Sequence, residues 1–202
     1  MHKPMQFLRL LPFLLILPAG SIPITPGVVT PEVDNPTIYD PPPAQKLDTY
    51  FEALARSGSA EEAARYEGEI YLIMTRNASP TITFLLESAS VALNAQDKES
   101  ARTALTSITE LDPNFAEGLA RLATIAYDDG DLVKAEALLK RTLALEPRHF
   151  AAWTGLGLVR EDLGDFLGAQ AAYREALFYH PYLEGAKRGL IRMEARLDGL
   201  SL

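Results

Sequence analysis

The sequence predicts an all-α fold in which antiparallel helix pairs stack into a solenoid. Three kinds of residue recur at a fixed period of 34 residues. The prolines are Pro113, Pro147 and Pro181, the alanines are Ala101, Ala135 and Ala169, and Gly-Asp pairs stand at 130–131 and 164–165. This period is typical of stacked helix–turn–helix units, each of which buries its apolar face only against its neighbours.

The composition excludes several classes of function. The chain of 202 residues has a formal net charge of −8 and contains no cysteine. The negative charge disfavours contact with nucleic-acid phosphates, so we expect no nucleic-acid partner. The missing cysteine excludes disulfides, thiolate metal sites, a cysteine nucleophile and a lipid anchor that needs this residue.

Residues 1–21 have the features of a secretory signal peptide. Lys3 and Arg9 form a basic region, residues 10–17 are mostly apolar, and small residues lead to Ser21. We expect cleavage after Ser21, a periplasmic or secreted protein, and no stable membrane insertion after cleavage. The alternative is an uncleaved anchor, although the apolar run is about half of the roughly 20 residues that a spanning helix needs.

Residues 22–45 predict a proline-rich, disordered linker. Seven prolines lie between residues 22 and 44. Proline lacks a backbone donor and fixes φ, so neither a helix nor a central strand is expected there. The segment is interpreted as an unstructured or polyproline-like tail, and a spacer or docking arm is the alternative.

Residues 46–79 predict a degenerate helical pair. An apolar stripe at helical spacing comes first and Gly58 ends it. The stripe consists of Leu47, Tyr50, Phe51 and Leu54. Gly58 lies 38 residues before Gln96, which is four more than the period. We expect this pair to cap the first repeat.

Three complete units follow at residues 82–115, 116–149 and 150–183, with each periodic proline at position 32. Positions 8 and 20 hold small residues, as a close crossing of the two helices in each unit requires. These pairs are Ala89 and Ala101, Ala123 and Ala135, and Gly157 and Ala169. Large residues at positions 4, 7 and 24 fill the space between neighbouring helices; they include Leu119, Leu122, Leu139, Trp153, Leu156 and Tyr173.

The Gly-Asp pairs mark the turn inside each unit. Glycine takes a left-handed conformation at low cost after a helix, and aspartate accepts hydrogen bonds from the free N–H groups of the next helix. The first unit departs from this pattern, because Gln96-Asp97 replaces Gly-Asp. After the third unit, residues 184–198 predict a capping helix. Its apolar face consists of Ala186, Leu190, Met193 and Leu197.

The third unit resembles the tetratricopeptide repeat (TPR) family. The matching residues are Trp153, Leu156, Gly157, Ala169, Tyr173, Ala176 and Pro181. The resemblance covers residues 82–183 and implies a right-handed superhelix whose first helices form a concave groove for partner segments. The groove residues that it implies are Glu117, Arg121, Thr124, Tyr127, Asp128, Thr154, Leu158 and Glu161. The equivalent positions of the first unit are Thr83, Leu86, Glu87, Ser90, Leu93 and Asn94.

No motif supports catalysis, a cofactor or a metal site. Residues 155–160 begin like a dinucleotide fingerprint, but they lack the third glycine and follow no strand. The acidic run 128–131 lacks the alternating ligands of an EF-hand loop. His149 and His180 have no ligand cluster near them in the sequence. The chain is therefore predicted to be no enzyme.

The leading hypothesis is a scaffold or adaptor of the bacterial cell envelope that binds a partner segment in the groove. Acidic groove residues favour a neutral or basic ligand. Family members that clamp a C-terminal carboxylate use Lys and Asn, whereas this chain offers only Arg121 in a suitable place. The alternative is an accessory subunit of an envelope enzyme or assembly system, which would present a substrate or assist the assembly of a cofactor or complex.

Overall fold

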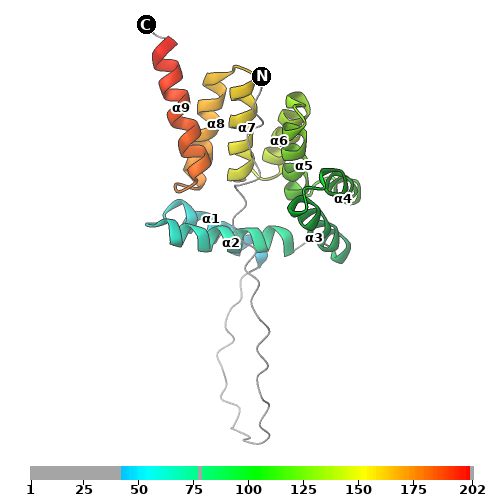
Figure 1. The fold of residues 1–202 in the computed structure, drawn as a ribbon. Helices are drawn as coiled ribbons and strands as arrows, with labels where there is room; N and C mark the ends of the chain where they lie inside the picture. Colours follow the sequence, from blue (N-terminus) through cyan, green and yellow to red (C-terminus); the bar gives the residue numbers. More distant parts are fainter. Residues whose placement is uncertain (1–41, 77–78, 201–202) are drawn as a thin grey trace, which may run out of the picture. The chain divides into compact units, whose positions relative to one another are not determined.

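The computed structural model describes residues 42–76 and 79–200, and every regular element in these two ranges is an α-helix (Figure 1). The elements are α1 (Pro43–Ala55), α2 (Ala60–Arg76), α3 (Pro80–Asn94), α4 (Lys98–Leu111), α5 (Ala116–Asp128), α6 (Leu132–Leu145), α7 (Phe150–Asp162), α8 (Phe166–Tyr179) and α9 (Glu184–Leu200). The predicted signal peptide and most of the predicted linker lie outside these ranges. In the described part, no helix is long and apolar enough to cross a membrane.

The end of the predicted linker needs a correction. Residues 43–45 are the first turn of α1 rather than linker. Proline is tolerated in this turn, because the N–H groups there have no partner within the helix.

Helices α3 to α8 form three antiparallel pairs, which confirms the predicted solenoid of helix pairs. The two helices of each pair contact each other, and successive pairs meet through α4 with α5 and α6 with α7 (Figure 1). The capping helix α9 packs on α8 and α7. Its predicted apolar face is turned inward, with Ala186 and Met193 fully buried and Leu190 half-buried.

The turns within the pairs have the predicted chemistry. Gly130 and Gly164 both have φ near +80°. Asp131 accepts a hydrogen bond from the backbone N–H of Lys134 at 3.1 Å, and Asp165 accepts one from Gly168 at 2.9 Å. Each aspartate thereby caps the second helix of its pair.

Gln96 takes the place of glycine in the first turn without changing its geometry. Its φ is +60°, in the left-handed region that the two glycines also occupy. Asp97 still caps α4 by accepting from the Ser100 N–H at 3.0 Å. The replacement of glycine by Gln96 therefore keeps the turn and places backbone strain at this one residue.

The crossing of the two helices in each pair leaves no room for larger side chains. Ala101, Ala135 and Ala169 are all fully buried. A Cβ added to Gly157 would lie 2.5 Å from a ring carbon of Tyr173. The periodic small residues thus set how closely the helices of a pair approach.

The α1–α2 hairpin packs differently from the cap that we expected over the first repeat. Its buried side chains Phe51, Leu54 and Ile70 form a cluster with Phe150, at the start of α7. Tyr179 and residues 182–183 pack against the same cluster, and α1 contacts α8. The hairpin thus contacts the third repeat (Figure 1).

The dimensions of the hairpin explain this difference. Helix α2 has 17 residues, whereas α4, α6 and α8 have 14 each. The hairpin also offers aromatic side chains, Phe51, Tyr50 and Tyr66, which pack in one cluster with Phe150, Tyr179 and Tyr182 of the third repeat and the turn after it.

Candidate partner-binding groove

The predicted groove residues come from two neighbouring helices. Glu117, Arg121, Thr124, Tyr127 and Asp128 lie on α5, and Thr154, Leu158 and Glu161 lie on α7. The structure brings these two helices into direct contact. We call the surface formed by α3, α5 and α7 the first-helix face.

At one end of this face, Arg121 is held by three hydrogen bonds. Its Nε donates to Oε1 of Glu117 at 2.6 Å, and one terminal nitrogen donates to Oγ of Ser90 in α3 at 3.0 Å. The other terminal nitrogen donates to the hydroxyl of Tyr71 in α2 at 2.5 Å. The Arg121 and Glu117 side chains are only 16% and 13% exposed. Arg121 is therefore committed to contacts within the chain.

His149 completes this buried cluster. Its Nδ1 accepts from the N–H of Ala152 at 3.2 Å and so caps α7. Its Nε2 faces Oε2 of Glu117 at 3.4 Å, without a well-aligned hydrogen bond. Burial opposes ionisation of Glu117, but His149 and Arg121 outweigh it and lower the pKa of Glu117 to about 2.

The other end of the face is also bonded across helices. The Tyr127 hydroxyl donates to Asp162 at 2.6 Å, and the Tyr173 hydroxyl donates to Glu161 at 2.9 Å. Arg192 of α9 donates two hydrogen bonds to Glu161, at 2.9 and 2.8 Å. Burial favours the neutral form of Glu161, but Arg192 and Tyr173 together lower its pKa below the ordinary value.

The remaining predicted residues differ in their availability. Thr124 and Asp128 are exposed, Thr154 is half-buried, and Leu158 is buried at 9% exposure. The two threonine hydroxyls donate to backbone carbonyls of their own helices.

The acidic groove residues are only partly available to a ligand. Burial raises the pKa of Asp128 despite the nearby Lys98. Of the acids that suggested a basic ligand, Glu117 and Glu161 already have cationic partners.

Sequence reasoning missed the contacts that hold the hairpin. Arg148 forms an ion pair with Asp48 at 2.6 Å and lies 4.3 Å from the centre of the Phe51 ring. His180 Nε2 lies 3.3 Å from Oε2 of Glu67. These partners are separated by 100 and 113 residues, so a 34-residue period carries no signal for them.

Nothing in the described ranges resembles a metal centre, since no group of three or more His, Asp or Glu side chains is placed to hold an ion. Several charged groups of the face pair instead with side chains of the same face or of α2, α8 and α9. The arrangement can bind through shape, apolar contact and hydrogen bonds.

Comparison with known proteins agrees with this arrangement. A tetratricopeptide repeat family model matches residues 86–145 and 121–184. The repeat array belongs to the tetratricopeptide repeat family. A TPR repeat-containing protein of Rhizobium etli is 28% identical over 125 residues, which cover 62% of this chain and 61% of the relative. The match thus spans less than two thirds of the relative's length.

Solved TPR domains have the same fold as this TPR array. The Sgt2 TPR domain of Aspergillus fumigatus superposes with a TM-score of 0.57 at 22% identity, over 61% of this chain and 83% of that one. The first TPR domain of Spaghetti (RPAP3), bound to an HSP90 peptide, also gives a TM-score of 0.57, at 19% identity. That match covers 60% of this chain and 96% of the other.

Proposed function

We propose that this TPR protein is an interaction scaffold of the bacterial cell envelope, which binds a segment of a partner protein on the first-helix face. The observation that carries the proposal is the exposed set of short polar and acidic side chains on this face. These are Thr83 and Asn94 of α3, Thr124 and Asp128 of α5, and Asp162 of α7. Similar TPR domains, such as the Spaghetti domain bound to an HSP90 peptide, support binding of an extended segment.

The chemistry of the face favours a neutral or basic segment. Arg121 cannot receive a partner's carboxylate without giving up Glu117, Ser90 or Tyr71. The exposed Asp128 and Asp162 would repel an acidic peptide and attract a basic one. The TPR array therefore differs in charge from a carboxylate-clamp groove.

In-cell photocrosslinking tests this surface. A photoreactive amino acid at Thr124 should crosslink a discrete partner, and the same amino acid at Ala137, which is exposed on α6, should not. Crosslinking at Thr124 should also weaken when Asp128 is changed to Lys. Equal crosslinks at both sites, or none at Thr124, would contradict binding on the first-helix face.

The envelope location rests on the sequence of residues 1–21. Their basic start and apolar run support export. Cell fractionation should find the protein in the periplasmic or secreted fraction, and deletion of residues 1–21 should keep it in the cytoplasm. The same fraction for both forms would contradict export through this segment.

A further inference from the structure

The outer side of α3 is an apolar face that no other helix of the described ranges covers. Phe84 and Val91 are 66% and 67% exposed there. One period later, Gly118 and Ile125 of α5 are buried, with Ile125 1% exposed. Two periods later, Ala152 and Val159 of α7 are also 1% exposed each. The same repeat positions are therefore covered in the second and third repeats and open in the first.

The preceding helix explains the burial in the later repeats. A Cβ added to Gly118 would lie 2.9 Å from Cγ2 of Ile108, which belongs to α4. Among the described residues, helix α3 has no such neighbour on this side, because the buried side chains of α2 pack in the cluster around Phe150. We call the side of α3 that carries Phe84 and Val91 the α3 face. It corresponds to the sides of α5 and α7 that are buried against the preceding repeat.

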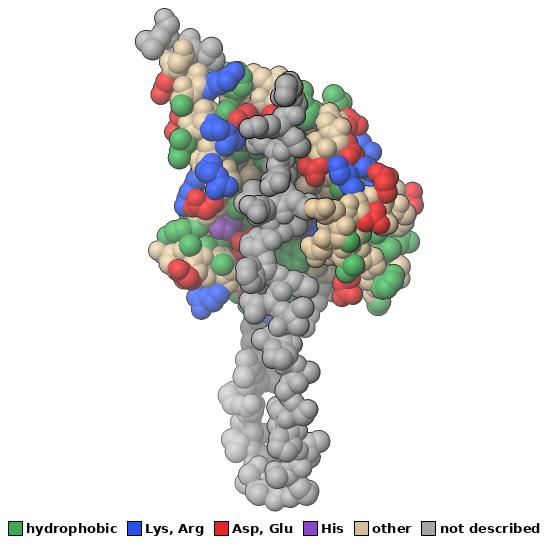
Figure 2. Space-filling model, viewed as in Figure 1, with side chains coloured by type: hydrophobic (Ala, Val, Ile, Leu, Met, Phe, Trp, Pro, Cys, Tyr) green, Lys and Arg blue, Asp and Glu red, His purple; other side chains and the backbone are tan. Residues whose placement is uncertain are grey.

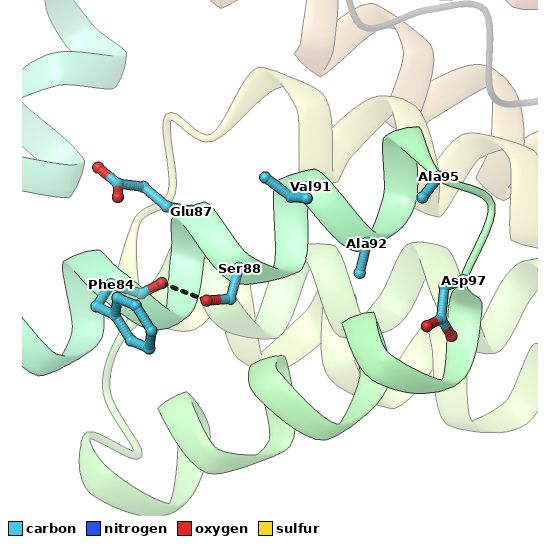
Figure 3. A pocket seen from close by; sticks show the side chains of 7 residues that line it. All are labelled: Phe84, Glu87, Ser88, Val91, Ala92, Ala95 and Asp97. Atoms are coloured by element: carbon cyan, nitrogen blue, oxygen red, sulfur yellow. Dashed lines mark hydrogen bonds between the residues drawn. The ribbon is translucent and has the colours of Figure 1, made fainter.

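This face is hollowed and acidic. A shallow depression of about 490 Å³ runs along α3 from Phe84 to Ala95 and reaches Asp97 (Figure 3). Within the depression the Ser88 hydroxyl is satisfied by the carbonyl of Phe84 at 2.9 Å. The charged residues between positions 80 and 97 are Glu87 and Asp97, with no Lys or Arg among them. A matching surface would be helical and apolar, with basic residues at its edge.

Helix α9 offers such a surface at the other end of the array. Arg188, Ile191 and Ala195 lie at helical spacing and are exposed, with Ile191 at 65%. Figure 2 shows Lys and Arg side chains along this helix. Arg192 is bonded to Glu161 and Arg196 lies 4.6 Å from the Phe166 ring centre. The ion pairs of α9 within residues 42–76 and 79–200 involve Glu184, Lys187, Arg192 and Glu194, and none involves Arg188.

We propose that the protein assembles end to end, with the α3 face of one molecule covered by the α9 face of a second copy. Phe84 and Val91 would pack on Ile191 and Ala195, and Glu87 would meet Arg188. The two faces differ, so the contact is heterologous and adds further molecules in a chain or ring rather than closing at a two-fold dimer. One helix from each molecule forms a small interface, so the association is weak and depends on concentration.

The charges favour this pairing over a symmetric one. Two α3 faces together would bring Glu87 from both molecules into one apolar interface without a cation. The α9 face, formed by Arg188, Ile191 and Ala195, supplies Arg188 as a cation for Glu87. The proposal uses the outer side of α3, which shares only Glu87 with the predicted groove positions, and it does not depend on binding of a partner segment on the first-helix face.

Sedimentation velocity on the purified protein tests the assembly. The mass of the wild type should rise with concentration, and both Phe84→Glu and Ile191→Glu should abolish the rise. Equimolar mixing of the two variants should restore association and stop at the dimer, because one variant keeps the α9 face and the other keeps the α3 face. Circular dichroism should show that both variants are folded. Val133→Glu, at a side chain 76% exposed on α6, should associate like the wild type.

Three outcomes would overturn the proposal. A wild type that remains monomeric at its highest soluble concentration would show that a second copy does not cover the α3 face, so that a different protein would be its partner. Association that survives Ile191→Glu but not Phe84→Glu indicates a symmetric α3 contact. Folded variants that fail to associate on mixing show that the two faces are not each other's partners.

Discussion

The guanidinium of Arg121 in α5 donates a hydrogen bond to the hydroxyl of Tyr71 in α2, 50 residues earlier in the chain. The same side chain also bonds Glu117 and Ser90. One residue thus connects the hairpin to the first two repeats. The residue that the sequence marks as the best ligand for a partner's carboxylate is used to hold the chain's own hairpin.

Replacing Arg121 by Ala should destabilise the protein by roughly 3–5 kcal/mol, because Glu117 would stay buried without its guanidinium partner. Tyr71→Phe should cost only about 1 kcal/mol, since it removes one hydrogen bond. Urea unfolding measures both. Arg174→Ala is the matched control, because Arg174 is 58% exposed in its ion pair with Glu194 and its loss should cost about 0–1 kcal/mol. Equal effects of the two arginine changes would contradict the buried cluster.

Acid should weaken the fold through Glu117. Its pKa is about 2 in the folded protein against an ordinary value of 4.5. Below 4.5 the unfolded chain takes up a proton that the folded chain refuses, so protons favour unfolding. The stability from this group is complete above about pH 4.5 and is lost as the pH falls towards 2, and it amounts to about 3 kcal/mol.

The difference between the wild type and Glu117→Gln isolates this effect from the other carboxylates. The variant should be less stable at neutral pH and should lose less stability between pH 4.5 and 2. Unfolding free energies from urea titrations at a series of pH values measure the difference. Two parallel curves would show that Glu117 is not held ionised by His149 and Arg121.

The repeats could be predicted from the sequence because their constraints are local. Aspartate marks every turn within a unit and glycine marks two of the three, and alanine at the crossing is required by the approach of two helices in the same unit. These signals recur every 34 residues and survive single departures such as Gln96. The same positions therefore specify both the register and the helix ends.

The site could be predicted only in part, because its state depends on contacts between distant segments. The period placed Arg121 and Glu161 on the first-helix face, but it could not show that Tyr71 and Arg192 bind them. The docking of the hairpin likewise depends on aromatic packing around Phe150. Such contacts depend on three-dimensional shape and produce no repeating pattern in the sequence.

Gln96→Gly should stabilise the protein by roughly 1 kcal/mol, because a side chain at φ +60° is strained and glycine is not. Conversely, Gly164→Ala should destabilise by about 1–2 kcal/mol at φ +80°, although an added Cβ there meets open space. Thermal melts of the two variants measure the opposite shifts. Equal shifts in one direction would mean that backbone strain does not decide these turns.

Ala135→Leu and Ala169→Leu should each cost roughly 1–3 kcal/mol or more, because both alanines are fully buried at a helix crossing with no space for three further carbons. The control is Ala171→Leu, at an exposed position of α8 near Ala169, which should change stability by about 0.5 kcal/mol or less. Thermal melts again provide the measurement. If the two buried variants melted like the control, positions 8 and 20 would not be where the helices of each repeat cross.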